Sequence, residues 1–307
     1  MSISNFIYRQ KQKIKYHFAI TDHERLVAEI NRNDRLIEFR ENSFKLKEAE
    51  FIFPIEYLFL LERYDDLVFL LSQSNGSFQL IGNQLVFKFN NLKLFIKTSE
   101  ELFIIKEVFY KQIYNINLGS TFNIIDVGMN VGFTSLYFAN RDDVQKVYSY
   151  EPFKTTFKDA QENFELNKEI EEKIERKNIG LGLDSKVIKV NYSNNLKGKN
   201  TTSNVTNLQS ESLDCATIEL VKASDEINAL VSSNRNQLFV IKLDCEGAEF
   251  DIFKSFGDQN ISEKIVAFMI EWHRNKPQLL IEKLIHNNFK VHCTTDSKEI
   301  GFIVAVR

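Results

Sequence analysis

The second half of the chain alternates apolar runs with stretches of helical spacing. The apolar-rich runs, typical of strands buried on both faces, occupy residues 122–127, 145–150, 238–243 and 265–270. Helical spacing occupies residues 133–140, 153–167 and 277–287. A less apolar stretch, Lys173–Leu181, is expected to be a third strand near an edge, and residues 289–293 and 302–306 a closing pair. This alternation predicts an α/β fold whose mostly parallel sheet is covered on both faces.

The first 110 residues follow a different pattern and carry no glycine-rich or carboxylate-rich motif. Pro54 begins a helical spacing that runs to Leu71, because proline suits a first helical turn. Alternating apolar residues on both sides of Asn90–Asn91 predict a β-hairpin with a two-residue turn, and a second helix is expected over residues 100–114. We therefore expect a small N-terminal α/β extension at residues 1–110 and a second domain at residues 111–307.

Composition and charge narrow the class of protein. The chain has 307 residues, of which 43% are hydrophobic and 26% charged, the balance of a soluble globular protein. The net charge of -3 argues against a nucleic-acid partner, because DNA-binding domains usually carry a basic footprint. No apolar run approaches the roughly 20 residues of a membrane span. The three cysteines form no C-x-x-C pair, which favours free thiols and a cytoplasmic location.

Residues 192–212 interrupt the alternation with many Asn, Ser and Thr residues. A polar loop of this length is uncommon inside a compact domain and often serves as a lid or binding loop. A tolerated surface insertion would have the same composition, and the sequence leaves both interpretations open.

A turn at Asp126–Gly132 ends the first buried strand and precedes a helix. Glycines in such a turn let the backbone bend and let a ligand approach closely, and ligands of open α/β sheets bind at the carboxyl ends of strands. Dinucleotide turns read G-x-G-x-x-G, whereas this one reads D-x-G-x-x-x-G, with Asn130 in place of a middle glycine. The negative charge of Asp126 disfavours a pyrophosphate and suits an ammonium or sulfonium group.

Glu151 ends the second buried strand and supports the same ligand site. An acidic residue at this position can accept hydrogen bonds from two ribose hydroxyls through its two oxygens. A solvated loop carboxylate is the alternative interpretation. Together with the turn, Glu151 favours a ribose-bearing cofactor.

Carboxylates crowd the ends of the two later strands. Asp244, Glu246 and Glu249 share one turn, and such crowding raises at least one pKa unless Lys242, a metal or a cationic ligand offsets it. Glu249 also has a structural explanation, because acidic residues favour the first turn of a helix. Glu271 and His273 end the next strand, where histidine is suited to general base work near neutral pH, although a lone histidine is more often structural.

These blocks together resemble the FkbM family of S-adenosylmethionine-dependent methyltransferases. The resemblance covers about residues 94–307, and the K-x-D-x-E-G-x-E block is its most specific part. The matching segments are IIDVGMNVGFTSLYFA (124–139), YEP (150–152), ENFELN (162–167), SLD (212–214), IKLDCEGAEFDIF (241–253) and IEWH (270–273). The departures are small: Met129 stands where alanine is common, and Cys245 where valine or isoleucine is usual.

The resemblance implies a class I (Rossmann-like) methyltransferase fold, with a seven-stranded, mostly parallel sheet whose last strand is antiparallel. It also implies O-methylation of a small-molecule or glycan acceptor, commonly a sugar or natural-product hydroxyl in a surface polysaccharide, glycolipid or glycosylated product. The residues that it assigns to S-adenosylmethionine are Asp126, Gly128, Asn130 and Gly132 for the methionine part, Glu151 for the ribose and Asn178 for the adenine.

Catalysis is expected from the acidic cluster. We expect His273 or Asp244 to accept the proton of the acceptor hydroxyl, with Glu246 and Glu271 orienting the substrate. A divalent metal held by Asp244 with Glu246 or Glu271 is a less favoured alternative, because oxygen ligands suit magnesium. A catalytically inactive S-adenosylmethionine-binding or scaffolding protein and a nicotinamide-dependent oxidoreductase are the competing functions. The absence of G-x-G-x-x-G argues against the oxidoreductase.

Overall fold

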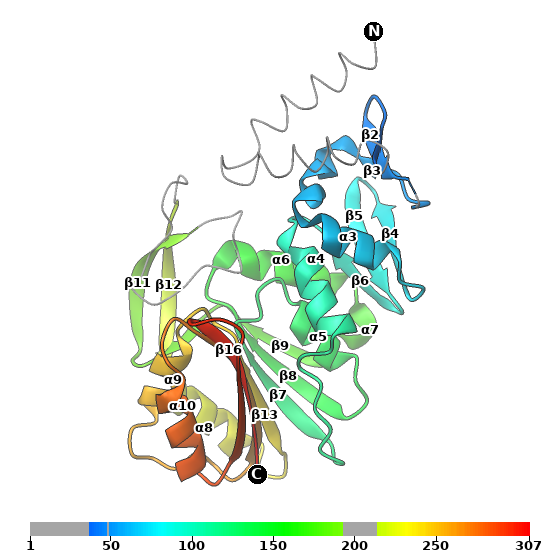
Figure 1. The fold of residues 1–307 in the computed structure, drawn as a ribbon. Helices are drawn as coiled ribbons and strands as arrows, with labels where there is room; N and C mark the ends of the chain where they lie inside the picture. Colours follow the sequence, from blue (N-terminus) through cyan, green and yellow to red (C-terminus); the bar gives the residue numbers. More distant parts are fainter. Residues whose placement is uncertain (1–36, 48, 193–213) are drawn as a thin grey trace. The chain divides into compact units, whose positions relative to one another are not determined.

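The computed structural model describes residues 37–47, 49–192 and 214–307 (Figure 1). The chain divides into two units, residues 1–111 and residues 112–307. Each unit is built around its own sheets and is described by itself below.

The N-terminal unit holds two small antiparallel sheets, with strand orders β1-β2-β3 and β4-β5-β6. The strands are β1 (Ile37–Phe39), β2 (Ser43–Leu46), β3 (Phe53–Pro54), β4 (Gly76–Ile81), β5 (Gln84–Phe89) and β6 (Leu92–Phe95). The expected hairpin around Asn90–Asn91 is confirmed as β5 and β6, where Asn90 takes the left-handed φ of 51° that the turn requires. Strand β4, which pairs with β5, was not expected.

The helices of this unit are shorter than the apolar spacing predicts. Residues 55–71 form a 3₁₀ segment, η1 (Ile55–Arg63), followed by α3 (Tyr64–Leu71), rather than one helix. The helix expected over residues 100–114 is α4 (Glu100–Ile105) continued by one π turn, η2 (Lys106–Tyr110). The side chain of Glu101 accepts hydrogen bonds from the backbone amides of Lys97 and Thr98, which holds the start of α4.

The C-terminal unit contains a seven-stranded sheet of order β15-β16-β14-β13-β7-β8-β9. Its strands are β7 (Phe122–Val127), β8 (Val144–Tyr150), β9 (Ile174–Lys177), β13 (Phe239–Leu243), β14 (Ile265–His273), β15 (Lys290–Thr295) and β16 (Ile300–Val306). The strands from β14 to β9 are parallel, and β16 is antiparallel to both β14 and β15. The chain therefore has the seven-stranded, mostly parallel sheet with an antiparallel last strand that the resemblance implies.

Helices cover both faces of this sheet. Figure 1 shows α8, α9 and α10 gathered on one side of the sheet and α5, α6 and α7 on the other. Their bounds are α5 (Phe133–Ala139), α6 (Lys154–Glu165), α7 (Lys168–Glu171), α8 (Ala223–Ser233), α9 (Glu249–Ser255) and α10 (Gln278–His286). All six residues of β7 and all five of β13 are buried, which explains why these strands are mostly apolar. The polar residues among them are Asn123, Asp126 and Lys242.

The expected third strand over Lys173–Leu181 is wrong as one element, because it divides between two sheets. β9 ends at Lys177, and β10 (Gly180–Gly182) joins a second sheet of order β10-β12-β11. Between the two strands, the Asn178 side chain donates to the backbone oxygens of Glu151 and Pro152 and turns the chain away from β8.

The second sheet of this unit contains an antiparallel pair that the sequence did not predict. It consists of β11 (Lys186–Tyr192) and β12 (Asp214–Lys222), with Lys186 opposite Leu220. One face of the pair packs Val190 and Ile218 against Phe153. In the sequence, β11 is followed by the polar segment at residues 192–212 and then by β12. Residues 193–213 are outside the part of the chain that the structure describes, and the interpretation of this segment as a lid lies there.

Candidate functional site

Three neighbouring parallel strands end together at one edge of the large sheet. Val127 of β7 pairs with Tyr150 of β8 on one side and with Leu243 of β13 on the other. The residues that follow these three, Gly128, Glu151 and Asp244, are therefore brought to the same edge. Parallel register thus joins two of the expected cofactor residues to an expected catalytic one.

The turn after β7 depends on glycine at two positions. Gly128 has a φ of 79°, and a Cβ atom there would lie 1.9 Å from the backbone oxygen of Asp244. Gly132 has a φ of 85°, and a Cβ atom there would lie 2.7 Å from the ring of Phe164. Asn130, between them, adopts a left-handed φ of 52°. The turn is therefore packed tightly against the end of β13 and against α6.

Glu151 is held against this turn by backbone amides. Its Oε2 atom accepts a hydrogen bond of 3.1 Å from Asn130 N, and its Oε1 atom accepts one of 3.0 Å from Phe153 N. The side chain is buried, and this burial raises its pKa to about 7 even though the two amide donors favour the charged form. Asn178 donates to the backbone oxygen of Glu151 at 2.8 Å, so it fixes the residue from the other side.

Asp126 lies inside the sheet, beneath the turn. It is fully buried, and its Oδ2 atom accepts a 2.6 Å hydrogen bond from Ser135. Its Oδ1 atom lies 3.1 Å from the ammonium nitrogen of Lys242, which also donates to the backbone oxygen of Gly128 at 2.8 Å. Burial alone would lower the pKa of Lys242, but the charges of Asp126 and Asp244 raise it. Asp126 thus contacts the turn through Lys242.

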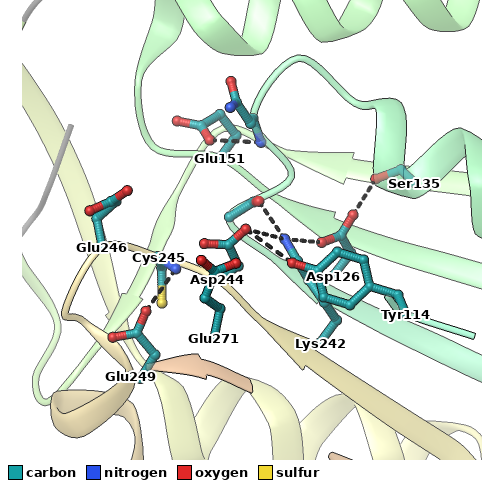
Figure 2. Close-up of polar contacts among 12 residues, drawn as sticks. Tyr114, Asp126, Ser135, Glu151, Lys242, Asp244, Cys245, Glu246, Glu249 and Glu271 are labelled. Atoms are coloured by element: carbon teal, nitrogen blue, oxygen red, sulfur yellow. Dashed lines mark hydrogen bonds and ion pairs between the residues drawn. The ribbon is translucent and has the colours of Figure 1, made fainter. Parts of the chain in front are cut away.

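Asp244 is anchored by a tyrosine from the segment before β7. The Tyr114 hydroxyl donates to Asp244 Oδ2 at 3.2 Å, and Lys242 lies 3.8 Å from the same oxygen (Figure 2). Tyr114 is buried, and burial together with the charges of Asp244 and Glu271 raises its pKa. Tyr114 was not predictable from the sequence, because it lies at the end of a stretch with helical spacing and belongs to no motif.

His273 lies among three glutamates. β14 runs three residues past the end of its pairing with β13, and its last residues pair with β16 instead, which extends Glu271 and His273 beyond the end of Leu243. His273 Nε2 is 3.7 Å from Glu271 Oε1 and 3.9 Å from Glu246 Oε1. Its Nδ1 atom is 3.2 Å from Oε1 of Glu249.

The electrostatics of this cluster depend on burial. Burial raises the pKa of Glu246 to about 7 and that of Glu271 to about 8. Burial alone would lower the pKa of His273, but the hydrogen bond and charge of Glu249, with the charges of Asp244 and Glu246, raise it to about 10. His273 is therefore positively charged near neutral pH. Glu249, for which the sequence left both a place among the carboxylates and a helix-start role open, contacts His273 in this cluster.

The described residues contain no group of three or more His, Cys, Asp or Glu side chains arranged to hold a metal ion. No helix in the same part of the chain is both long enough and apolar enough to cross a membrane. All three cysteines are free thiols.

The end of β7 and β8 has the properties of a cofactor cradle. A side chain at Gly128 would meet the backbone of Asp244, so glycine lets the turn pack directly against the end of β13. Asn130 Oδ1 is buried and has no hydrogen-bond partner among the described residues. Glu151 adds two carboxylate oxygens beside it. These groups fit a ligand that carries both hydroxyl and amine donors.

Comparison with known proteins places the site in a family. The sequence profile of the methyltransferase FkbM domain matches residues 126–294, which include all the strand ends described above. Methyltransferase sdnD of Sordaria araneosa is 25% identical over 188 residues, covering 54% of this chain and 72% of that protein. Methyltransferase 1 of Beauveria bassiana (strain ARSEF 2860) is 24% identical over 171 residues, covering 52% of this chain and 68% of that protein.

Among solved structures, methyltransferase FkbM from Methylobacillus flagellatus KT superposes with a TM-score of 0.41 at 14% identity. The superposition covers 64% of this chain but 47% of that one, so the chain spans about half the length of this structural relative. Because the FkbM profile matches more than half of the chain and spans both the glycine turn and the K-x-D-x-E-G-x-E block, the chain belongs to the FkbM methyltransferase family.

Proposed function

We propose that residues 111–307 form an S-adenosylmethionine-dependent O-methyltransferase, with the cofactor at the ends of β7 and β8 and the acceptor at the ends of β13 and β14. The observation that carries this proposal is the meeting of Gly128, Glu151 and Asp244 at one sheet edge. It puts a candidate ribose ligand and a candidate proton acceptor at the ends of the two strands, β8 and β13, that flank β7. Ligands of open α/β sheets bind at this edge.

The cofactor residues follow from the contacts of the cradle. Glu151 would accept hydrogen bonds from the two ribose hydroxyls, and Gly128, Asn130 and Gly132 would surround the methionine part. Asp126 would act indirectly, because its carboxylate is occupied by Ser135 and Lys242. Asn178 would lie near the adenine while holding the backbone of Glu151. When bound, S-adenosylmethionine supplies a methyl carbon activated by a sulfonium charge.

On the acceptor side, Asp244 is the better of the two expected bases. Its side chain is 32% exposed, whereas that of His273 is 6% exposed. His273 also retains its proton near neutral pH. Asp244 would therefore take the hydroxyl proton onto its carboxylate. Holding the acceptor oxygen close and aligned would supply most of the remaining rate enhancement.

The carboxylates at this end also indicate the class of acceptor. Glu246 and Glu271 have side chains that are 22% and 32% exposed, so both can reach a ligand. Carboxyl groups accept or share hydrogen bonds with hydroxyls, and neighbouring hydroxyls are typical of sugars. We favour a sugar hydroxyl of a surface polysaccharide, glycolipid or glycosylated natural product. The cytoplasmic location and the absence of a nucleic-acid partner stay predictions.

The direct test is transfer of a tritiated methyl group from S-adenosylmethionine to a panel of nucleotide sugars, oligosaccharides and glycosylated natural products. We expect a base-stable methyl ether on one class, a loss of about 10²–10⁴-fold in Asp244→Asn, and full activity in the exposed control Asp251→Asn. Activity should survive EDTA treatment. A product methylated on nitrogen would refute the O-methyl assignment, and loss of activity with EDTA would restore the metal alternative.

A further inference from the structure

Glu249 is a fully buried carboxylate in the first turn of α9. Its Oε1 atom accepts a 2.9 Å hydrogen bond from Cys245 N and lies 3.2 Å from His273 Nδ1. Its Oε2 atom is buried and has no hydrogen-bond partner among the described residues. A carboxylate so enclosed requires a compensating charge, since an unpaired buried charge costs several kcal/mol.

His273 supplies that charge, and the pairing determines how its ring is oriented. Glu249 also interacts with the Cys245 thiol, but of these two partners only His273 can carry a positive charge. The Nδ1 atom must therefore donate, because the carboxylate oxygen can only accept. With Nδ1 bound, the opposite ring nitrogen is directed toward Glu246 and Glu271.

The Nε2 atom is left with donor capacity toward the acceptor side. Its distances of 3.7 Å to Glu271 and 3.9 Å to Glu246 are too long for direct hydrogen bonds. Those two carboxylates are the partly exposed ones, whereas Glu249 and His273 are buried. A hydroxyl group placed among the three could accept from Nε2 and donate to a carboxylate.

We propose that Glu249 is a positioning residue that holds His273 through Nδ1, so that the Nε2–H group is presented to the acceptor hydroxyl between Glu246 and Glu271. The geometry of the pair stands without any assumption about catalysis, whereas its role toward the acceptor rests on the proposed function. His273 then serves as a cationic hydrogen-bond donor that favours the deprotonated acceptor oxygen. Asp244 remains the proton acceptor.

The ring state of His273 can be read directly in the full-length protein by long-range ¹H–¹⁵N NMR, with the signal assigned by its loss in His273→Gln. We expect protons on both ring nitrogens at pH 7.5 and a strongly deshielded Nδ1 proton. A neutral ring with its proton on Nε2 would overturn the proposal.

The variant Glu249→Gln keeps the shape of the side chain and removes its charge. We expect His273 to titrate at least about 1 pH unit lower, because an opposite charge at this distance has been removed. The matched control is Asp251→Asn, on the same helix, where the side chain is exposed and paired with Lys254. It should leave the His273 titration unchanged, and an equal change in both variants would contradict the proposal.

Activity measurements distinguish the Glu249–His273 contact from its proposed role toward the acceptor. Once an acceptor is identified, Glu249→Gln should lower kcat about tenfold and shift the alkaline limb of its pH profile down with His273, while the KM for S-adenosylmethionine changes little. Glu249→Asp, which keeps the charge, should recover part of both effects. If methyl transfer is absent altogether, the proposed function fails while the NMR result stands. If transfer occurs and kcat is unchanged in Glu249→Gln, the positioning role fails alone.

Discussion

The candidate site is held by backbone groups at the ends of β7 and β8 and by side chains at the ends of β13 and β14. At the ends of β7 and β8, the contacts come mainly from the backbone: two glycines shape the turn, and amide groups hold Glu151. At the ends of β13 and β14, side chains hold one another, as Tyr114 does Asp244 and Glu249 does His273. Contacts from backbone groups suit a ligand that is the same in every related protein. Contacts from side chains can be changed by substitution and so suit acceptors that differ.

Lys242 joins the two ends, and its removal should have the largest effect. Lys242→Met leaves Asp126 buried without its cation, which we expect to destabilise the C-terminal unit by about 3–5 kcal/mol. The measurement is chemical denaturation, with the exposed Lys254→Met as the matched control. The double variant Asp126→Asn/Lys242→Met should recover part of the loss. A double variant as unstable as the sum of the two single ones would contradict the pairing.

Gly128 tests the backbone-built end. Gly128→Ala places a Cβ atom 1.9 Å from the backbone oxygen of Asp244, so the end of β13 must move, and we expect a loss of about 2–3 kcal/mol together with weak cofactor binding. Gly119→Ala is the control, because Gly119 has a similar positive φ of 67° with nothing within 4 Å of its Cβ position. If both variants lose the same amount of stability, the effect comes from backbone strain and not from close packing at Gly128.

The protonation of Glu151 should make cofactor binding pH-dependent. With a pKa of about 7 in the free protein, the carboxylate that ribose hydroxyls would bind forms only as the pH rises. We expect the affinity for S-adenosylmethionine to increase about tenfold between pH 6 and pH 8, as measured by calorimetry. Glu151→Gln should remove this dependence, and Glu175→Gln, an exposed carboxylate on β9, should retain it.

The same group affects stability with the opposite sign. Because the folded pKa of Glu151 lies above the ordinary value of 4.5, the folded protein binds more protons than the unfolded chain between those values. Its contribution to stability therefore decreases as the pH rises from about 4.5 to 7. In thermal unfolding experiments, the stability of Glu151→Gln should decrease less than that of the wild type between pH 4.5 and 7. The same pH dependence in both proteins would contradict a raised pKa at Glu151.

Tyr114 tests the side-chain-built end, with the smallest expected effect. Tyr114→Phe keeps the ring beside Lys242 and removes the hydrogen bond to Asp244. We expect kcat to fall about threefold to tenfold, the worth of one hydrogen bond, with cofactor affinity unchanged. Tyr148→Phe, which loses a 3.4 Å contact with Asn234, is the control. A larger loss in the control variant would argue against a specific role for Tyr114.

The difference between the two ends also explains how far the sequence could predict the molecule. Strands such as β7 and β13 were predictable because burial on both faces leaves a mostly apolar run, and the turn at Gly128 because glycine marks a backbone requirement. The pairing of β11 with β12 was missed because one of its faces is exposed, so apolar residues such as Val190 and Ile218 lie between polar ones and form no continuous run.

The side-chain network was harder to predict for a physical reason. Tyr114 and Asp244 are 130 residues apart, and no local pattern connects them. Glu249 carries an ordinary helix-start signal that conceals its contact with His273, because both explanations require an acid at that position. Asp126 was expected beside the ligand, but it points inward and pairs with Lys242. Predicting this pair requires the register of β7 with β13, which places the two residues opposite each other. The roles of these residues in binding and catalysis stay predictions.

The proposed function assigns cofactor binding and acceptor chemistry to different residues. Calorimetry with S-adenosylmethionine on the wild-type protein, Glu151→Gln and Asp244→Asn tests it directly. We predict that Glu151→Gln weakens binding about 10- to 100-fold at pH 8, whereas Asp244→Asn stays within about threefold of the wild type. Tight binding to Glu151→Gln, or an equal loss in Asp244→Asn, would contradict a cofactor cradle at the ends of β7 and β8.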